Sequence, residues 1–579
     1  MHRRQDPAGG SRRAQAGTET VVPAGSTAVS PITSPGSVSS PGSPDKPGGW
    51  GYSAVATAAG LVFCAVALWS LLGNVLFPHF GHSRYETGWA LAACLLVLVL
   101  MLVLYLGLRK AGPLLLRHRF LAGLGTAALW ILLFTAHVRL AYAVRLPADW
   151  DSHPIFMSAS GLALGTQTEI DAPYFSLNPN NILLTLLLSG YFRLALDLGV
   201  TDLDMAAAAL NALVLFAGIA LTYAAGRMLG GRTVGAFTLL PSVILVLLSP
   251  WLGVLYSDTT GLMFPVLILC LLLAAQRTRR MTVRIPLWVL AGAVGAVGYG
   301  IKPTVLMCLL AAGAAAVCSP ALRARGRGAG VLLLGIAVVS GSFFAGHRMI
   351  SAFEQQSPTI GFNVADNPAA MPPTHFLKVG AQSAPGPHGL MYGRYNDDDY
   401  WATVNITDPE EKFRHGLDAY RERVAAMGAG GYISFLNHKL LWITGDGSFY
   451  SWGEGRRTGS DFISTDPADR FIQDVYGNNR PGFPWLLTLW QGTWFALLAL
   501  VAVPLFLRTP RLLLPEVSAM RIALLGLLLF LLLSEGRARF LYLYTPYFIL
   551  LASLSFQALA DRLLPARHAG SGRRRKMIE

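Results

Sequence analysis

"GWALAACLLVLVLMLVLYLGL" (residues 88–108) is an apolar run without a charged residue, and Arg109 and Lys110 follow it directly. A helix of this length can cross the ~30 Å hydrocarbon core of a bilayer. The whole chain has the same character, because 53% of its 579 residues are hydrophobic and only 13% are charged. This composition is typical of a polytopic membrane protein and excludes an ordinary soluble domain.

Comparable apolar runs recur along the chain and predict about twelve membrane-spanning helices. They lie near 54–77, 88–108, 121–143, 204–227, 232–250, 258–276, 285–300, 303–318, 328–347, 485–507, 518–534 and 541–562. A further run, 181–199, contains Arg193 and Asp197 and would be the thirteenth span if it crossed the membrane. We therefore expect an all-α polytopic membrane protein with a long extracytoplasmic loop of mixed structure.

The formal net charge of +14 comes from short clusters of Lys and Arg between the apolar runs and at both termini. Such clusters stay on the cytoplasmic side of a membrane, which explains the charge better than nucleic-acid binding does. All clusters lie inside if both termini are cytoplasmic and 181–199 does not cross. We therefore expect 181–199 to lie at the outer interface, packed against the loop before it; an ordinary span is the alternative.

This topology predicts the domain organisation. The predicted parts are a disordered cytoplasmic tail (1–48), an N-terminal transmembrane domain (49–347) with a first extracytoplasmic loop (144–203), a large extracytoplasmic loop (348–484), C-terminal transmembrane helices (485–563) and a basic cytoplasmic tail (564–579). The tail 1–48 is rich in Pro, Gly, Ser and Thr and has no apolar period, which is typical of disorder. The protein is expected in the plasma membrane.

Four short polar motifs reach the outer face in this topology. They are "DWDSHP" (149–154), "YSDTT" (256–260), "KPT" (302–304) and "SEGRARF" (534–540). We see no chain of acidic residues at mid-membrane and no inverted repeat, one of which a transporter would be expected to show. Polar chemistry gathered at one surface favours an enzyme that takes its substrate from the outer leaflet.

Asp149 and Asp151 follow the third apolar run, where the chain leaves the membrane. A carboxylate in this position could act as a general base on an acceptor hydroxyl. The structural alternative is a helix cap, since Pro154 suits the first turn of a helix and Asp151 or Ser152 could cap it.

The same ambiguity holds for "FSLNPNNILL" (175–184). The amides of Asn180 and Asn181 could hydrogen-bond sugar hydroxyls. Alternatively, they could cap the helix that begins at Ile182. From the residues alone, capping is the better interpretation.

Charged residues in the other motifs also have two interpretations. Asp258 could cap the next span, or contact an acceptor or a metal beside Asp151. Lys302 lies between two apolar runs and therefore needs an anionic partner such as a lipid phosphate, unless it reaches the interface. Arg537 and Arg539 suit phosphate oxygens, although pairing with Glu535 or ordinary headgroup contact would also explain them.

The long loop contains predicted helices of its own. In "TDPEEKFRHGLDAYRERVAAMG" (407–428), Asp408 is a predicted N-cap, Pro409 the first helical residue and Gly428 the stop. An apolar-periodic helix follows in "YISFLNHKLLWIT" (432–444) and could lie on the membrane. The next stretch, "GDGSFYSWGEG" (445–455), predicts a turn whose aromatic faces suit carbohydrate rings or the membrane interface.

Taken together, these motifs resemble the GT-C superfamily of membrane glycosyltransferases, which use polyprenyl-phosphate sugars as donors. The nearest branch is bacterial and related to protein O-mannosyltransferases and aminoarabinose transferases. It carries an acid at the start of the first external loop, a "YPNN"-like motif, a "YSD" turn and an Arg-rich element before a "P-Y" span. Here these look like Asp151, "LNPNN" with Leu177 in place of the aromatic residue, "YSD" ending at Asp258, and "RARFLYLYTPY" (537–547). "PPTHFLKVG" (372–380) and "KLLWITGDGSFYSWGEG" (439–455) also look like that branch, so the resemblance covers most of the chain from about residue 120.

The resemblance implies an inverting sugar transfer in which Asp151 is the base and Asp149 the alternate. It further implies that Asp258 contacts the acceptor or a metal, and that Lys302, Arg537 and Arg539 bind the donor phosphate. The chain lacks the adjacent Asp-Glu pair of protein mannosyltransferases, which argues against a protein acceptor. No clear metal site appears, which leaves a divalent metal open as a cofactor.

The expected function is therefore transfer of a sugar from a polyprenyl-phosphate donor to an extracytoplasmic glycan or lipid of the cell envelope. Expected partners are these two substrates and membrane lipid, without nucleic acid. The alternative is a transporter or flippase of lipid-linked sugars, and a non-catalytic membrane scaffold is a third interpretation.

Overall fold

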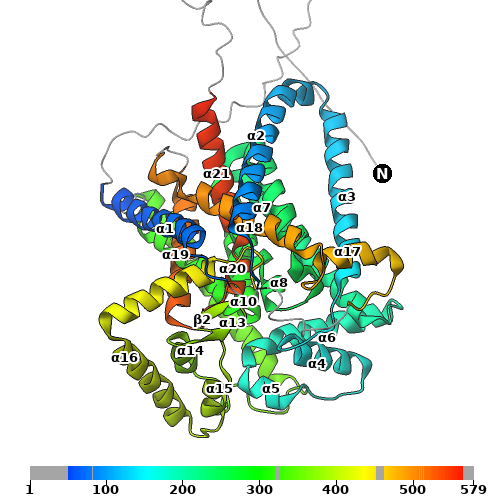
Figure 1. The fold of residues 1–579 in the computed structure, drawn as a ribbon, viewed down its shortest axis with the longest axis vertical. Coiled ribbons are helices and arrows are strands. Elements are labelled where there is room, and N and C mark those ends of the chain that lie inside the picture. Colours follow the sequence, from blue (N-terminus) through cyan, green and yellow to red (C-terminus); the bar gives the residue numbers. More distant parts are fainter. Residues whose placement is uncertain are drawn as a thin grey trace, which may run out of the picture. The chain divides into compact units, whose positions relative to one another are not determined.

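The computed structural model describes residues 50–80, 83–319, 322, 326–450, 462–507, 509, 512 and 514–564. The predicted tail 1–48, all but the first residue of the predicted tail 564–579, and the second part of the predicted aromatic turn (451–455) lie outside these residues. The longest helices are α1 (Trp50–Leu76), α2 (Thr87–Arg117), α3 (Arg119–Val144), α7 (Leu203–Ser242), α10 (Met281–Ile301), α13 (Arg327–Gln356), α16 (Pro409–Thr444), α18 (Phe483–Ala502), α19 (Pro515–Leu533) and α21 (Thr545–Leu563) (Figure 1).

Shorter elements connect these helices. The α-helices among them are α4 (Ser152–Leu164), α5 (Ala172–Leu177), α6 (Ile182–Asp197), α8 (Ser257–Gly261), α9 (Met263–Arg277), α11 (Leu306–Val317), α14 (Pro373–Gly380), α15 (Asp397–Val404), α17 (Arg470–Tyr476) and α20 (Arg539–Tyr542). Short 3₁₀-helices are η1 (Pro179–Asn181), η3 (Pro250–Gly253), η4 (Pro303–Val305), η6 (Pro467–Asp469) and η7 (Val503–Leu505), and η2 (Val243–Leu247) is a π-helical turn. The strands β1 (Ser383–Gly386) and β2 (Gly389–Tyr392) form an antiparallel hairpin in which Ser383 pairs with Tyr392.

Within the described residues, 9 helical segments are long and apolar enough to cross a membrane. They are Val55–Leu76, Thr87–Gly112, Arg119–Val144, Leu203–Leu247, Ser257–Arg277, Met281–Ile301, Arg327–Gln356, Phe483–Leu505 and Pro515–Leu533. The apolar helix Pro303–Val317 is shorter. Each of these segments coincides with a predicted run, except Leu203–Leu247, which covers two, and the total of about twelve spans stays a prediction.

The segment Leu203–Leu247 is a helical hairpin rather than one long helix. Its backbone leaves the helical conformation at Gly231, which has a φ of 82° that favours glycine. A Cβ added to Gly226 would lie 3.2 Å from the Cα of Gly235. On a straight helix, positions nine residues apart are separated by about 13 Å. The chain therefore folds back on itself, in agreement with two predicted runs at 204–227 and 232–250.

Helix α6 corresponds to the ambiguous run 181–199. It has 16 residues, fewer than the ~20 that a membrane span needs. Its main neighbour is α4, beside which it lies in Figure 1. Arg193 of α6 donates a hydrogen bond to the carbonyl of Leu162 on α4, at 3.1 Å. This packing is the one expected for a helix held against the preceding loop.

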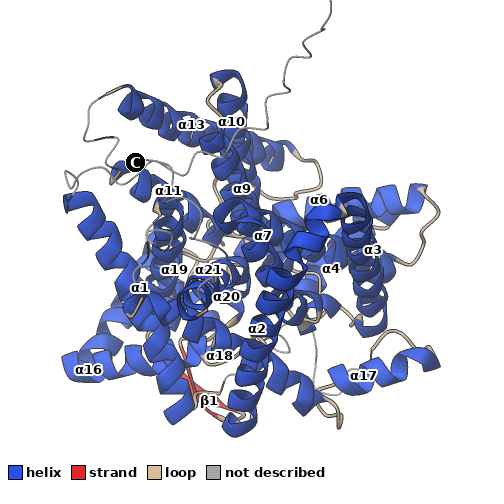
Figure 2. Cartoon of the chain, turned by 90° about the horizontal axis from the view of Figure 1, so that it is seen from above, coloured by secondary structure: helices blue, strands red, loops and turns tan. Residues whose placement is uncertain are grey.

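The apolar core forms where the long helices pack on one another. Helix α18 contacts α1, α2 and α21 and is buried along most of its length (Figure 2). Helix α21 packs on α7 as well, and all of its first twelve residues are buried. Helices α10 and α13 pack side by side, and α11 packs on α19. This arrangement brings the ends of α8, α10 and α20, which carry three of the polar motifs, close together.

The large loop folds into α14, the β-hairpin, α15 and α16. Asp408 caps α16 by accepting a hydrogen bond from the backbone N–H of Glu411 at 2.8 Å, and Pro409 is the first helical residue. Gly428 breaks the helix with a φ of 63°. The sequence-based prediction of two helices on either side of Gly428 is therefore confirmed.

Candidate active site

Asp151 accepts hydrogen bonds from two tyrosines on both of its carboxylate oxygens. The hydroxyl of Tyr174 lies 3.2 Å from Oδ1, and the hydroxyl of Tyr256 lies 3.1 Å from Oδ2. Tyr174 belongs to α5, whereas Tyr256 precedes α8, 105 residues away from Asp151. The fold thus joins the "DWDSHP" and "YSDTT" motifs, as the predicted topology requires.

The backbone beside Asp151 adopts an unusual turn. Trp150 has a φ of 46° although it is not glycine, and its N–H donates to Asp149 Oδ1 at 2.9 Å. The hydroxyl of Ser152 donates to the carbonyl of Asp149 at 2.6 Å and accepts from its N–H at 3.0 Å. A positive φ at a non-glycine residue stores backbone strain, and such strain clusters at functional sites.

These contacts decide between the two interpretations of the acid motif. The side chain of Asp151 makes no cap hydrogen bond to α4, because both of its oxygens face the tyrosines. Capping by Asp151 is therefore wrong, while Ser152 closes the turn that starts the helix. Asp149, the alternate base, is 8% exposed and is bonded within this turn.

The amides of the "LNPNN" motif also point to Asp151. Asn181 donates from Nδ2 to the Tyr174 hydroxyl at 2.7 Å, and Asn180 donates to Asn181 Oδ1 at 3.1 Å. Neither side chain caps α6, so the capping interpretation of these residues is wrong. A chain of hydrogen bonds instead runs from Asn180 through Asn181 and Tyr174 to Asp151. Direct sugar binding by the two amides stays a prediction.

Asp258 and Lys302 form a buried ion pair. The ammonium of Lys302 lies 2.9 Å from Oδ1 and 3.0 Å from Oδ2 of Asp258. Asp258 is fully buried and Lys302 is 8% exposed. Lys302 therefore has the anionic partner that its position demands, but this partner is a side chain. Asp258 does not cap the span, because both of its oxygens face Lys302. A position of Lys302 near the membrane interface stays a prediction.

Two cations lie over the ring of Tyr256. The Lys302 Nζ is 5.5 Å from the ring centroid, and the guanidinium carbon of Arg539 is 5.6 Å from it. Both cations also contact the ring of Phe540, at 4.9 Å and 5.0 Å. Asp151, Lys302 and Arg539 therefore share one neighbour, which makes a common site.

Arg537 is held differently from Arg539. Its guanidinium lies 3.0 Å from Glu535 Oε1, the pairing that the sequence left open, and 5.7 Å from the ring centroid of Tyr450. The adjoining end of α19 is anchored by Lys439, which is fully buried. Its ammonium donates to the carbonyls of Gly380 at 2.7 Å, Leu532 at 3.0 Å and Ser534 at 2.6 Å. No contact in the described residues joins Arg537 to Asp151 directly.

The turn before the undescribed stretch 451–461 is buried. Phe449 and Tyr450 are 1% and 5% exposed, and each has a φ of 58°. Asp446 holds them by accepting from the Ser448 N–H at 2.8 Å and the Tyr450 N–H at 2.9 Å. Phe449 packs on Trp494, with ring centroids 5.2 Å apart. The aromatic faces of these two residues therefore fill the core rather than meeting a sugar or the membrane.

Two tyrosines of the large loop lie within electrostatic reach of Asp151. Burial, with hydrogen bonding to Asp397 and a smaller contribution from Asp151, raises the pKa of the Tyr395 phenol. Burial and then Asp151 also raise the pKa of Tyr400. The rings of Tyr395 and Tyr400 are 5.6 Å apart. The electrostatic influence of Asp151 therefore extends to these two phenols of the large loop.

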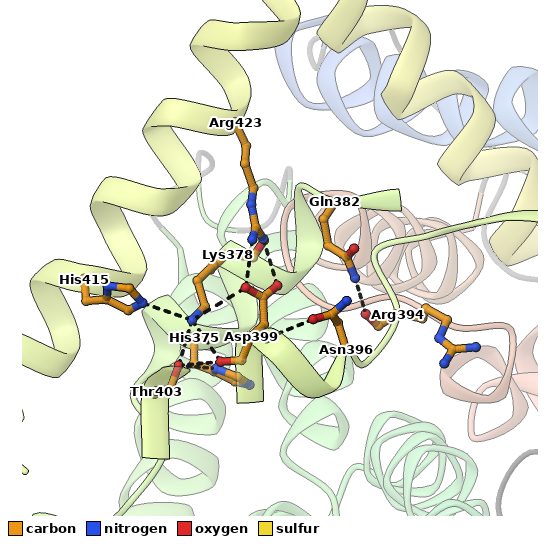
Figure 3. A network of polar contacts seen from close by, with 9 residues as sticks. All are labelled: His375, Lys378, Gln382, Arg394, Asn396, Asp399, Thr403, His415 and Arg423. Carbon is orange, nitrogen blue, oxygen red and sulfur yellow. Dashed lines mark hydrogen bonds and ion pairs between the residues drawn. The ribbon is translucent and has the colours of Figure 1, made fainter. Parts of the chain in front are cut away.

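A network of polar side chains fixes the helix that carries Tyr400 (Figure 3). Arg423 of α16 binds both oxygens of Asp399 on α15, at 2.7 and 2.8 Å. Lys378 of α14 donates to Thr403 Oγ1 at 2.8 Å and to the Asp399 carbonyl at 3.0 Å. These contacts tie α14, α15 and α16 into one unit.

The described residues contain no group of three or more His, Cys, Asp or Glu side chains that could hold a metal ion. Asp258, the predicted metal contact, directs both oxygens at the Lys302 ammonium instead. A cation beside this carboxylate would have to displace another cation. The described donors around Asp151 and Asp258 therefore do not fit a divalent metal.

Residues 57–560 match the family model described as "conserved hypothetical integral membrane protein". The chain belongs to this family. It is accordingly an integral membrane protein, as its apolar runs predict. Neither the curated proteins nor the solved structures include a match to the chain.

The sequence-based interpretation of this integral membrane protein missed several residues of the site. Tyr256 begins the "YSDTT" motif, and Tyr174 directly precedes "FSLNPNNILL". The sequence around a tyrosine does not indicate that its hydroxyl will bond to an acid elsewhere in the chain. A signal was present at Tyr256, since it directly precedes "SD". Tyr395 and Tyr400 had no such signal, because only the folded loop brings them near Asp151.

Proposed function

We propose that the protein is a GT-C-type glycosyltransferase that moves a sugar from a polyprenyl phosphate to an extracytoplasmic glycan or lipid. One observation carries the proposal: Asp151 and the cations Lys302 and Arg539 contact different parts of Tyr256. An acid beside a cationic site is the arrangement that sugar transfer from a phosphate requires. The base acts on the acceptor while the cations neutralise the leaving group.

In the proposed reaction, the acceptor hydroxyl oxygen attacks the anomeric carbon of the donor and forms the new glycosidic bond. The bond from this carbon to the phosphate oxygen breaks, and the electron pair leaves with the polyprenyl phosphate. Asp151 takes the acceptor proton. Lys302 and Arg539 stabilise the negative charge that develops on the leaving phosphate. Arg537, two residues before Arg539, is a further donor to this phosphate.

The site would lie at the outer membrane interface. Trp89 and Trp485 begin α2 and α18, and they are 61% and 70% exposed, with ring centroids 6.2 Å apart. Exposed tryptophans are enriched at the level of lipid headgroups. In α2, Arg109, Lys110 and Arg117 lie toward the end opposite to Trp89, which supports placing both termini in the cytoplasm.

The test is sugar transfer by the full-length protein in detergent micelles, with radiolabelled polyprenyl-phosphate sugars and a cell-envelope extract as acceptor. We expect transfer by the wild type and none by Asp151→Asn. The control is Asp418→Asn, which removes an exposed carboxylate of the large loop that is paired with Arg421 on the same helix face, at 3.4 Å. It should transfer sugar as the wild type does.

Two outcomes would contradict the proposal. Translocation of the lipid-linked sugar across vesicles without transfer would support the transporter. Full transfer by Asp151→Asn would remove Asp151 from the reaction. Loss of one envelope glycan on deletion of the protein would identify the acceptor.

A further inference from the structure

Tyr256 is fixed in place before any substrate binds. Its side chain is 4% exposed. Its N–H donates to Thr259 Oγ1 at 3.1 Å, and its carbonyl accepts from the hydroxyls of Thr259 and Thr260, each at 2.9 Å. Two residues later, Asp258 holds Lys302. One short turn therefore determines the positions of both Tyr256 and the cation of the proposed phosphate site.

The hydroxyl and the ring of Tyr256 have different partners. The hydroxyl donates to Asp151 Oδ2, at 3.1 Å. The ring contacts Lys302 and Arg539, whose charges lie 5.5 and 5.6 Å from its centroid. A phenol ring is rigid, so the hydroxyl that bonds the base and the ring that contacts the cations stay at a constant separation.

Tyr174 bonds to the other oxygen of the Asp151 carboxylate. Asn181 donates to the Tyr174 oxygen at 2.7 Å, which leaves the phenol proton for Asp151 Oδ1 at 3.2 Å. Burial raises the pKa of Tyr174 well above its usual value, so this phenol stays a donor. With one phenol on each oxygen, the Asp151 carboxylate cannot rotate without losing a hydrogen bond.

We propose that Tyr256 is a positioning residue that orients Asp151 through its hydroxyl and aligns the phosphate-binding cations through its ring. The inference rests on the proposed function, because it assigns roles within the same reaction. The hydroxyl and the ring of Tyr256 therefore have separate effects. Loss of the hydroxyl should slow the chemical step, whereas loss of the ring should also weaken donor binding.

The experiment compares Tyr256→Phe and Tyr256→Leu in the transfer assay, with the donor concentration varied. For Tyr256→Phe we expect kcat to fall about 10- to 100-fold, the effect of one hydrogen bond to a charged group, with the donor KM within about twofold of the wild type. For Tyr256→Leu we expect an additional rise in donor KM of about tenfold, because two cation–π contacts are lost. Tyr174→Phe should lower kcat and leave the donor KM unchanged.

The matched control is Tyr432→Phe, which removes a phenol that is hydrogen-bonded to the Tyr420 hydroxyl at 2.9 Å within α16. It should keep the wild-type kcat and KM. The inference is overturned if Tyr256→Phe has the wild-type kcat, or if Phe and Leu at this position give the same donor KM. Should Tyr256→Leu not fold in micelles, Tyr256→Phe and Tyr174→Phe decide the hydroxyl role. Failure of the wild type to transfer sugar would refute the proposed function itself, which is a different result.

Discussion

The buried ion pair between Asp258 and Lys302 offers a quantitative test of the site. Asp258→Asn would leave the Lys302 ammonium, 8% exposed, without its carboxylate. Lys302→Met would leave a fully buried carboxylate without its ammonium. Removing one partner of a buried pair costs about 3–5 kcal/mol of stability, because the other charge is left uncompensated. We expect each single substitution to lower the free energy of unfolding by this amount.

The double variant should be much less damaging than the sum of the two single variants. Desolvating two charges offsets most of their attraction, so replacing both partners is close to neutral. The expected coupling energy is therefore at least about 3 kcal/mol. The assay is equilibrium unfolding in mixed dodecyl maltoside and sodium dodecyl sulfate micelles, followed by tryptophan fluorescence.

A control cycle uses the Asp418–Arg421 pair of α16, whose side chains are 63% and 66% exposed. Solvent screens such a pair, and its coupling should be below about 0.5 kcal/mol. The reasoning is refuted if the Asp258 and Lys302 effects are additive. Additivity would mean that the two charges are stabilised separately, for example by a bound ion.

Three further results are expected. Burial, assisted by Lys378, lowers the pKa of His375 to about 4 from its usual 6.5. The unfolded chain therefore protonates this histidine at a higher pH than the folded chain does. The free energy of unfolding should fall by about 3 kcal/mol as the pH drops from 6.5 to 4. His375→Gln should abolish this loss in acid unfolding curves. Ser152→Ala should lower the free energy of unfolding by about 1–2 kcal/mol. Asp151→Asn should abolish transfer in a protein that still folds, at a stability cost of about one hydrogen bond because one phenol then faces the amide nitrogen; failure of Asp151→Asn to fold would contradict this division. Trp150→Gly should raise stability by about 1 kcal/mol by relieving the positive φ, because the 61% exposed Trp150 loses little contact; unchanged or lower stability would contradict this.

Much of the fold could be predicted because membrane helices obey local rules. A long uncharged run has few stable alternatives in a bilayer, since every backbone group must bond within its own helix. Caps and stops are local as well, which is why Asp408 and Gly428 behave as predicted. The separation of the 204–227 and 232–250 runs also followed from a local signal, the polar and glycine-rich stretch around Gly231.

The site was only partly predictable, and the errors have one cause. Asp151, Asn181 and Asp258 each precede or begin a helix, so capping was a sound local explanation for all three. In the fold they bond to distant partners instead: Asp151 to Tyr256, Asn181 to Tyr174, and Asp258 to Lys302. A buried charge or amide takes the partner that compensates its lost hydration best, wherever in the chain that partner lies.

The sequence by itself determined that the chain enters a membrane, where its apolar helices run, and which polar motifs lie between their ends. These properties follow from composition and from periodicity over short distances. Only the tertiary structure decided that Tyr256 bonds to Asp151 through its hydroxyl and contacts Lys302 and Arg539 through its ring. The reason is physical: hydrophobic length is a property of one segment, whereas the pairing of buried polar groups depends on how all the segments pack together.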